Sequence, residues 1–424
     1  MKAFAPRDRS RAVRENGAVT RLLVLGAGPA QLGVLAAARG RGDLTVVAAD
    51  RDPSAPGFSY ADRRAIVSIE DEPAIERLAR AEDVNGIIAP GSDHAVAVAA
   101  RVAERLGLPL PVAPEVATLA VNKLKQRERL TKAAIAQPRS LVCRTLAEVA
   151  DAADELGYPV VVEAPDRAGE RSVALSPDRE ALAAAAAEAL ADAHDDYCLV
   201  EELVTGPTVT VNAFSVGGRF VPLTVTDREL APPPAFGVTL AHVWPAELEP
   251  AAIAGAIAIA GAAARALGVV DGPTTTQVLI PDEGPPLLAK VSARVGGGHD
   301  GELCRVALGV DANALAIAAA LGEEVRAQDL APSRGVGAAC VRFLVAPAGV
   351  LHEVRAVGEA FAVAGVRGIR IYRKPGHVFR ELRRASDRAG AILATGDTRD
   401  DALDAADEAA ERIRFVTRAV EAVA

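Results

Sequence analysis

The stretch that most constrains the fold is DGPTTTQVLIPDEGPPLLAKVSARVGGGHDG, at residues 271–301. Two runs of β-branched and apolar residues are separated by a short segment that contains Pro, Asp and Gly. This pattern predicts two strands joined by a turn. The glycines Gly296, Gly297 and Gly298 follow, and because glycine has no Cβ, the backbone there can approach a ligand or turn left-handed. The alternative is a surface hairpin followed by a flexible loop.

The beginning of the chain predicts a parallel sheet. Residues 21–53 contain an apolar run, a Gly-rich turn, a helical segment and a second apolar run. Strand, helix and strand in this order indicate a βαβ unit. Gly26 and Gly28 open a turn like that of dinucleotide-binding proteins, but Gln31 stands where the third glycine of that fingerprint belongs. The match to an NAD site is therefore incomplete.

Composition narrows the class of partner. The chain has 424 residues, 50% of them hydrophobic, which is enough for two to four subdomains. Its net charge of -9 and its 3% of aromatic residues argue against nucleic acid as a partner, because phosphate binding needs clustered Lys and Arg. We therefore expect a small-molecule partner and no nucleic acid.

Several features predict a cytoplasmic protein. The four cysteines lie far apart without C-x-x-C spacing, which is typical of a reduced protein with buried thiols. Residues 1–20 are polar and Arg-rich, so we expect a disordered tail and no signal peptide. The Ala-rich run at 251–270 is interrupted by Arg265 and is interpreted as a soluble helix, so no membrane partner is expected.

The hairpin, together with segments before and after it, resembles the ATP-grasp superfamily, in particular the carboxylate-amine ligases that include L-amino-acid ligases. In that family the hairpin is approximately Gly-Pro-Thr-His-Thr-Glu-Val, then Ile-Glu-Ile-Asn-Ala-Arg and glycines. The resemblance implies that two Glu and the Asn hold the Mg²⁺ ions that bridge the ATP phosphates, since hard cations prefer oxygen ligands. It also implies a mixed α/β and α+β fold.

The resemblance divides the chain into four parts. A pre-ATP-grasp domain with a parallel sheet follows the tail at 21–118. The ATP-grasp domain is expected at 119–330, with a small lid subdomain at about 135–200, and a C-terminal lobe at 331–424. In that lobe Thr398 predicts the start of a final helix whose apolar stripe continues to Val420.

The hairpin departs from the family at the metal positions. Gln277 and Lys290 stand where the two metal-binding Glu are expected, Ser292 replaces Asn, and Thr275 replaces His. Arg294 is retained. A cationic Lys at a metal position repels the ion that the site was built to hold, so this pattern predicts an ATP-grasp fold that has lost its metal site.

The residues at the expected nucleotide-binding positions also depart from the family pattern. Lys123 matches the family lysine that contacts a phosphate, and Glu201 and Glu202 fit the hinge strand. However, Glu163 occupies a second lysine position, and Gly169 alone remains of the phosphate loop. An acid that faces a triphosphate weakens binding. We therefore predict a vestigial nucleotide site and, as a hypothesis, an ion pair between Glu163 and Lys290 across the vacated cleft.

Three functions remain open from the sequence. The chain is a repurposed enzyme that acts on a carboxylate or amino acid without ATP, a non-catalytic or regulatory partner of an active ligase, or a working ligase with other metal ligands. No cofactor is expected, except ATP and Mg²⁺ in the third case, and relatives suggest a homodimer. The candidate catalytic residues are Lys290, Glu163, Arg294, His299 and His242; the candidate substrate-binding residues are Arg294, Gly296, Gly297, Gly298 and Ser292; the vestigial nucleotide residues are Lys123, Glu201, Glu202, Gly169 and Gln277; no metal ligand is predicted.

Overall fold

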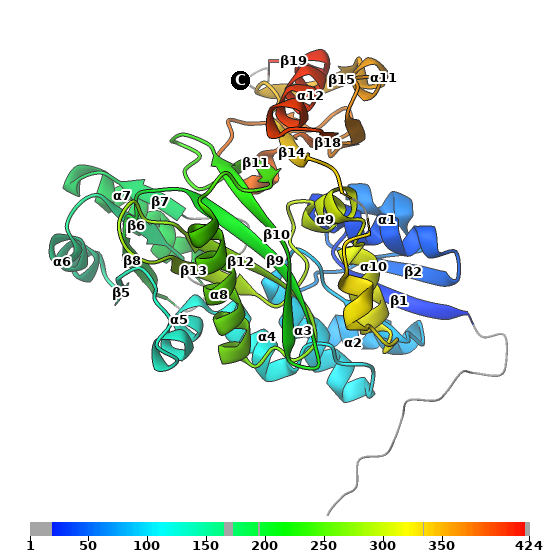
Figure 1. The fold of residues 1–424 in the computed structure, drawn as a ribbon, viewed down its shortest axis with the longest axis horizontal. Coiled ribbons are helices and arrows are strands. Elements are labelled where there is room, and N and C mark those ends of the chain that lie inside the picture. Colours follow the sequence, from blue (N-terminus) through cyan, green and yellow to red (C-terminus); the bar gives the residue numbers. More distant parts are fainter. Residues whose placement is uncertain (1–18, 165–172, 194–195, 334, 420–424) are drawn as a thin grey trace, which may run out of the picture.

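The computed structural model describes residues 19–164, 173–193, 196–333 and 335–419. The tail predicted at 1–20 lies almost wholly outside these ranges. Figure 1 shows the N-terminal parallel sheet on the right and a long central sheet in the middle, with the C-terminal segment above. On the left is the small sheet with helices at the position predicted for a lid, and we call this part the lid below. The parallel sheet at the N-terminus and the antiparallel sheets elsewhere confirm the predicted mixture of α/β and α+β structure.

The N-terminal segment forms the predicted βαβ unit. Strands β1 (Thr20–Leu25) and β2 (Leu44–Asp50) pair in parallel and are joined by α1 (Leu32–Arg41). Their apolar residues are largely buried, as expected for a parallel sheet covered by helices. The sheet order is β3-β2-β1-β4, with β3 at Arg63–Ile66 and β4 at Gly86–Ile88. The further helices up to residue 132 are η1 (Pro29–Gln31), η2 (Pro56–Tyr60), α2 (Glu72–Ala81), α3 (Asp93–Leu106), α4 (Pro114–Val121) and α5 (Lys123–Lys132).

The lid is a separate small sheet with two helices packed on it. Its strands have the order β5-β8-β6-β7, and all of its neighbouring strands are antiparallel. The side chain of Asp178 caps α7 by accepting hydrogen bonds from the backbone of Glu180 and Ala181. The segment between β6 and β7 lies outside the described residues. The lid elements are β5 (Ser140–Cys143), α6 (Leu146–Leu156), β6 (Val160–Glu163), β7 (Val173–Ser176), α7 (Arg179–Asp192) and β8 (Cys198–Glu202).

The central sheet contains the predicted hairpin. It has eight strands in the order β13-β12-β9-β10-β11-β14-β18-β16, with antiparallel neighbours throughout. Strands β12 (Gly272–Leu279) and β13 (Leu287–Ser292) form the hairpin, so this prediction is confirmed. The other elements from 208 to 344 are β9 (Thr208–Val216), β10 (Arg219–Leu230), β11 (Thr239–Trp244), α8 (Pro250–Leu267), α9 (Asp300–Leu308), α10 (Ala312–Ala320), η3 (Ala327–Leu330) and β14 (Ala338–Leu344).

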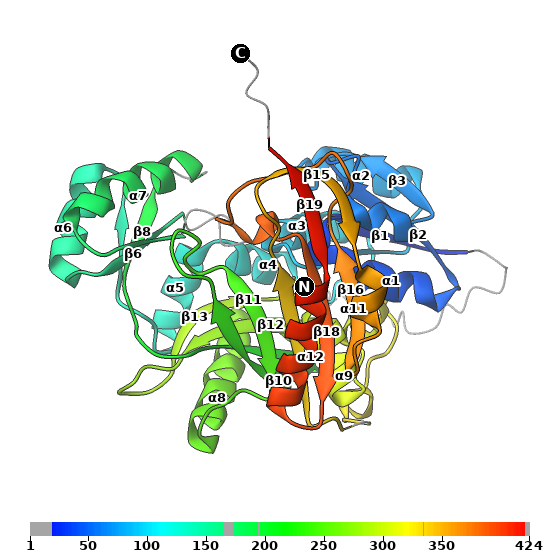
Figure 2. The ribbon, with the colours of Figure 1, turned by 90° about the horizontal axis from the view of Figure 1, so that it is seen from above.

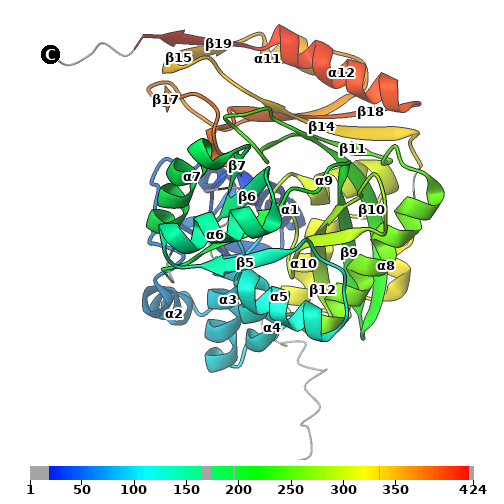
Figure 3. The ribbon, with the colours of Figure 1, turned by 90° about the vertical axis from the view of Figure 1, so that its left-hand side faces the viewer.

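The sheet continues without a break into the C-terminal segment, as Figure 3 shows from the lid side. Strand β11 pairs with β14, and β14 pairs with β18 (Gly390–Gly396), which in turn pairs with β16 (Val366–Ile371). One apolar core beside these strands includes Val243 of β11 and Cys340 of β14. The C-terminal segment is therefore joined to the centre of the molecule by backbone hydrogen bonds as well as by apolar packing.

The end of the chain differs from the prediction. Helix α12 (Arg399–Arg412) begins where predicted, with Thr398 as its cap, but it does not continue to Val420. The chain turns at Ile413 into strand β19 (Arg414–Arg418), which pairs with β15. The residues RFVTR include β-branched and aromatic side chains, which favour a strand once a partner is present. The remaining elements are β15 (Gly349–Arg355), α11 (Val357–Phe361), β17 (Val378–Phe379) and η4 (Ala385–Asp387). Figure 2 shows β15 and α11 from above, and Figure 3 shows β17.

Helix α8 is the longest apolar helix among the described residues. By length and composition alone it could cross a membrane, as could α9 and α10 if this bent pair were a single span. However, Ala256, Ala260 and Ala264 of α8 are buried in one core with strands β9, β12 and β13. One face of α8 therefore packs against the central sheet.

The four cysteines are buried and form no disulfides, as predicted. Cys143 and Cys198 belong to the core of the lid. Burial raises the pKa of the Cys143 thiol to about 12, and that of Cys304 to about 12 as well. Such thiols pack as small apolar side chains and are poor nucleophiles.

Candidate functional site

Asp93, Lys290 and Arg294 form one charged cluster beside the hairpin. Lys290 lies on β13, Arg294 follows that strand, and Asp93 is the first residue of α3. The Nζ atom of Lys290 is 2.7 Å from Oδ2 of Asp93, and Nε of Arg294 donates to Oδ1 of Asp93 at 2.6 Å. Two of the predicted site residues are thus brought together by a third residue from the N-terminal segment.

Asp93 carries its negative charge in the interior. The residue is 3% exposed, whereas 27% of the Lys290 side chain and 14% of the Arg294 side chain are exposed. Burial alone would raise the pKa of Asp93, but the charges of Arg294 and Lys290 outweigh it and hold that pKa well below its usual value. At neutral pH the cluster therefore has two cations and one anion.

A second charged cluster joins the lid to α5. The Nζ atom of Lys123 is 2.5 Å from Oε1 of Glu163 and 2.9 Å from Oε2 of Glu201. Arg127 donates to Oε1 of Glu201 at 2.5 Å. All four side chains are at most 13% exposed. Burial would raise the pKa of Glu201, but the charges of Lys123 and Arg127 outweigh this and lower it.

The predicted ion pair between Glu163 and Lys290 is wrong. In the described part of the chain Glu163 pairs with Lys123, whereas Lys290 pairs with Asp93. The reason is topological: β6 of the lid brings Glu163 to the first turn of α5, and β13 brings Lys290 to the first turn of α3. Each unusual charge is neutralised by a different segment.

The other predicted nucleotide residues lie apart from that cluster or outside the described ranges. Oε1 of Glu202 accepts a hydrogen bond from the backbone of Arg139 at 2.8 Å, at the base of the lid. Gln277 is half-buried and lies opposite Lys290 in the hairpin register. Gly169 lies outside the described residues. The predicted nucleotide set is therefore not one continuous group of contacts.

The glycine loop is packed against protein. Gly298 donates its N–H to Oδ2 of Asp300 at 3.0 Å. A Cβ added to Gly296 would lie 2.0 Å from the Asp300 carboxylate, and one added to Gly298 would lie 2.6 Å from Nε2 of His242. At Gly297 the nearest atom would be 3.0 Å away. Gly296 and Gly298 are thus required by the packing of the loop itself, independently of any ligand.

His299 lies at the start of α9 in a buried network. Its φ of 61° is left-handed, which is unusual for a residue with a side chain. Its Nδ1 atom contacts the carboxylate of Glu302, and its Nε2 atom is 2.6 Å from the hydroxyl of Tyr372. Burial raises the pKa of Tyr372. Burial would also raise the pKa of Glu302, but the charges of His299 and Arg370 outweigh this and lower the pKa to about 2.

His242 lies under the same loop and interacts with Asp300. His242 is 6% exposed, and Asp300 is 4% exposed. Burial would raise the pKa of Asp300, but the charge of His242 and a hydrogen bond from Asn212 at 3.1 Å lower it. The two candidate catalytic histidines are therefore held inside the protein by partners of their own.

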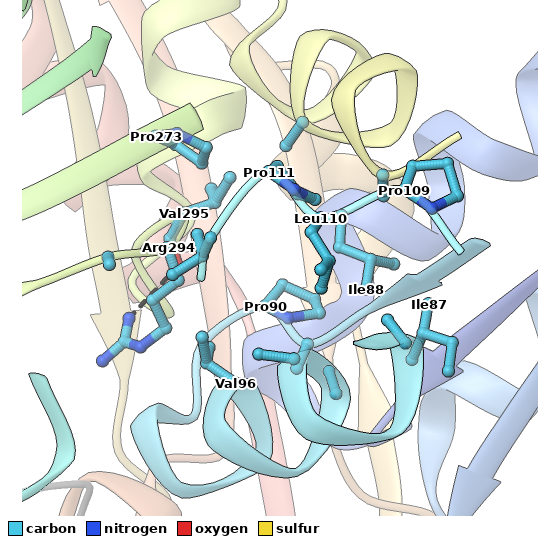
Figure 4. A pocket seen from close by; sticks show the side chains of 18 residues that line it. Ile87, Ile88, Pro90, Val96, Pro109, Leu110, Pro111, Pro273, Arg294 and Val295 are labelled. Atoms are coloured by element: carbon cyan, nitrogen blue, oxygen red, sulfur yellow. Dashed lines mark hydrogen bonds between the residues drawn. The ribbon is translucent and has the colours of Figure 1, made fainter. Parts of the chain in front are cut away.

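A cavity of about 60 Å³ opens between the N-terminal segment and the hairpin. Its walls come from β4, α3, the loop at 109–112, and the backbone around Pro273 and Val295 (Figure 4). Arg294 is the charged residue among its lining. In Figure 4 the guanidinium of Arg294 points away from Leu110 and Ile88, so the cavity itself is apolar.

Some site residues were missed from the sequence, although weak signals existed. Asp93 follows a buried strand in the segment PGSD, and carboxyl ends of parallel strands often carry functional side chains. Arg127 lies four residues after Lys123, on the same helix face. Tyr372 had no distinguishing sequence pattern.

Comparisons with known proteins agree with this architecture. The family model for L-amino acid ligase C-terminal domain 2 matches residues 342–418. The model for the ATP-binding domain of the carbamoyl-phosphate synthase L chain matches residues 122–213. An uncharacterized protein, y4rH of Sinorhizobium fredii, is 28% identical over 331 residues, which are 77% of this chain and 67% of that protein.

Solved structures show the same fold. The L-amino acid ligase of Bacillus licheniformis superimposes with a TM-score of 0.80 at 20% identity, over 94% of this chain and 99% of that one. The phosphoribosylglycinamide synthetase of Anaerococcus prevotii has a TM-score of 0.72 at 21% identity, over 94% and 100%. The N5-carboxyaminoimidazole ribonucleotide synthetase of Thermotoga maritima has a TM-score of 0.71 at 18% identity, over 94% and 100%. These likenesses confirm the fold that the sequence predicted.

Proposed function

We propose that this chain, which has the ATP-grasp fold of the carboxylate-amine ligase type, acts on a small carboxylate or amino acid without ATP and Mg²⁺. The observation that carries the proposal is the internal pairing of the cleft charges. Lys123 is paired with Glu163 and Glu201, and Lys290 is paired with Asp93. Lys123 and Arg127 are matched by two carboxylates, which leaves no net positive charge for a triphosphate. The pairing of Lys290 with Asp93 leaves no free carboxylate there for a metal ion.

The nucleotide side supports the proposal because its cations are already neutralised. Lys123 and Arg127 face two carboxylates at 2.5 to 2.9 Å. A triphosphate would have to displace Glu163 and Glu201 or bring more negative charge beside them. Breaking a buried ion pair by removing one partner costs about 3–5 kcal/mol. Binding of ATP here is therefore opposed by the free-energy cost of separating these charges.

The hairpin residues at the expected metal positions also support the proposal, because they do not suit a metal ion. The ammonium of Lys290 has no lone pair for a metal, whereas Mg²⁺ prefers carboxylate and other oxygen ligands. Acids nearby are engaged elsewhere, Asp300 with Asn212 and Gly298, and Glu302 with His299. The residues present on the hairpin therefore do not suit an ATP-bridging Mg²⁺ ion.

The carboxylate side offers a net positive charge. Lys290 and Arg294 share one anion, Asp93, so the cluster keeps a charge of about +1 by the protonation states expected at neutral pH. Arg and Lys both bind carboxylates, Arg with the more directional geometry. The apolar cavity beside the backbone of Arg294 has space for a short apolar group. A monocarboxylate with an apolar side chain fits both features.

Lys290 is the candidate for chemistry. Its side chain is 27% exposed, more than that of Arg294 at 14% or Glu163 at 13%. A partly exposed lysine can hold an anionic substrate, or transfer a proton to it. His299 and His242 are 8% and 6% exposed, and His299 is held by Glu302 and Tyr372, so neither is freely available to a substrate.

That burial favours a second candidate function, binding without turnover. A chain that recognises a carboxylate and signals its presence to an active ligase needs the Lys290 and Arg294 cluster but no acid-base group. Incubation of the protein with a panel of amino acids and 2-oxo acids, without ATP, separates the two candidates. Turnover that is lost in Lys290→Ala supports the enzyme, whereas saturable binding without turnover supports the binding protein.

The proposal as a whole is tested by thermal unfolding with and without MgATP. A ligand that binds only the native state must raise the melting temperature. We expect no shift with MgATP and a shift with the correct carboxylate that disappears in Arg294→Ala. A clear MgATP-dependent rise, lost on removal of Mg²⁺, would instead indicate a working ATP-dependent ligase.

A further inference from the structure

A second, smaller cavity lies between helix α9 and the strands β14, β16 and β18. Its volume is about 30 Å³. A cavity measured in this way needs about 10–15 Å³ for each water. This one therefore has room for two or three waters, which is comparable to three of the four oxygens of a phosphate group.

The charged lining of this cavity is mainly cationic. Arg305, Arg367 and Arg370 are among the lining residues, together with the acidic Glu302. The formal charges of these three arginines and Glu302 sum to +2. This positive lining contrasts with the whole chain, which has a net charge of -9.

Two of these arginines keep much of their hydrogen-bonding capacity for a ligand. Arg367 donates from its Nε atom to Oγ1 of Thr395 at 2.8 Å. The side chain of Arg305 is 55% exposed, and its Nε lies 3.9 Å from Asp311, near the outer limit of an ion pair. In the described structure neither arginine is held by a close carboxylate.

Arg370 is the third and most buried of the set. It lies 3.1 Å from Oε1 of Glu302 and 3.2 Å from the hydroxyl of Tyr60, with its guanidinium 5.9 Å from the centre of the Tyr60 ring. Its position is therefore fixed from both sides. A preorganised guanidinium loses less conformational freedom when it binds an anion.

We propose that this cavity binds a phosphate group, free or as a phosphate monoester, through Arg305, Arg367 and Arg370. The formal charge of +2 on the three arginines and Glu302 matches a dianion, whereas a carboxylate would leave one positive charge of this set uncompensated. Guanidinium groups donate two parallel hydrogen bonds to phosphate oxygens. The site shares no residue with the Asp93 cluster, so it goes beyond the proposed function and does not depend on it.

Glu302 connects this cavity to the glycine loop. A bound phosphate competes with Glu302 for Arg370, and Glu302 also contacts Nδ1 of His299. His299 follows Gly298 directly and caps α9 in a left-handed conformation. Phosphate therefore acts on the residue that fixes the end of the glycine loop, and the expected role of the site is regulatory.

The binding test is calorimetric titration of the full chain with inorganic phosphate at constant ionic strength, with glycerol phosphate and acetate as separate arms. We expect binding of phosphate that Arg305→Gln with Arg367→Gln weakens at least about tenfold, since one hydrogen bond to a charged group contributes about 1.5 kcal/mol or more. Arg179→Gln removes an arginine that is 69% exposed on the lid and serves as the control.

Each outcome decides the proposal. Phosphate binding that is equal in the parent and in the double variant overturns it, as does acetate binding as tight as that of phosphate. If glycerol phosphate binds more tightly than inorganic phosphate, the physiological ligand is a monoester, and the reverse order indicates free phosphate. Both arginines are surface residues, so loss of the fold does not confuse the result.

The link to the loop has its own test. Glu302→Gln removes the carboxylate that competes for Arg370, so phosphate should bind at least as tightly as in the parent; weaker binding would overturn the role given to Glu302. Trp244 packs in one apolar cluster with Val341 and Leu393, which also line the cavity. Its fluorescence should change with phosphate in the parent and not in the double variant.

Discussion

Replacing Asp93 by Asn tests the charge cluster on which the proposed function depends. Asn keeps the size of the side chain and removes its charge. Lys290 and Arg294 then face each other without the anion that now lies 2.7 and 2.6 Å from them. The substitution is therefore expected to lower the free energy of unfolding at neutral pH.

The magnitude follows from the burial of the three groups. Removing one partner of a fully buried pair typically costs about 3–5 kcal/mol. The side chains of Lys290 and Arg294 are 27% and 14% exposed, so water partly solvates the charges left behind. This places the expected cost at the lower end, about 3 kcal/mol. Lys290→Met combined with Asp93→Asn removes one of the unpaired charges and should recover part of that loss.

The assay is urea unfolding followed by the fluorescence of Trp244, the single tryptophan of the chain. Asp154→Asn is the matched control, because Asp154 pairs with Arg179 on the surface, where the two side chains are 47% and 69% exposed. Exposed pairs contribute about 0–1 kcal/mol. If Asp93→Asn costs no more than Asp154→Asn, the cluster is not held by its charges and the reasoning is refuted.

The pH dependence gives a second check. The folded pKa of Asp93 is depressed, so its contribution to stability is fully present above the unfolded value, about 3.9 for Asp. It is lost as pH falls from there towards the folded pKa. The difference between the parent and Asp93→Asn should therefore be largest at neutral pH and shrink below about pH 4.

Three other predictions concern the loop and the helix ends. Gly298→Ala should destabilise the protein by about 1–3 kcal/mol, because the added Cβ would lie 2.6 Å from Nε2 of His242 and overpack the loop. Gly358→Ala is the control, and because there is open space around Gly358 it should be neutral or stabilising. Thermal unfolding of both variants measures the difference. Thr398→Ala should cost about 1 kcal/mol in urea unfolding because α12 loses its cap, and no loss would contradict that role. The pKa of Glu302 in the folded protein is about 2, so its stabilising effect should be present above its unfolded pKa and disappear as pH falls towards 2. The measurement is the difference in the free energy of unfolding between the parent and Glu302→Gln. A difference that grows on acidification would refute this prediction.

Local patterns predicted the elements whose formation depends on nearby residues. The hairpin of β12 and β13 and the βαβ unit at the N-terminus follow from apolar runs and turn residues within about thirty positions. The resemblance then supplied the overall fold, and the structural likenesses confirm that fold. The end of α12 was missed because β15, the partner of β19, lies some sixty residues earlier.

Charge pairing could not be predicted in the same way. Asp93 and Arg294 are separated by 201 positions, and their contact depends on how the N-terminal sheet packs against the hairpin. From the sequence, Glu163 and Lys290 were two unusual charges at one expected cleft, which suggested a pair. The structure shows that each has an oppositely charged partner from another segment: Glu163 pairs with Lys123, and Lys290 pairs with Asp93.

The shared sheet of β11, β14 and β18 has a consequence for how such a protein can be shortened or recombined. A cut near residue 331 would leave residues 241–244 of β11 without the partner strand β14, and unpaired strand edges promote intermolecular strand addition. The last ninety or so residues are therefore not an independent domain that can be removed or replaced. We expect a chain truncated there to aggregate.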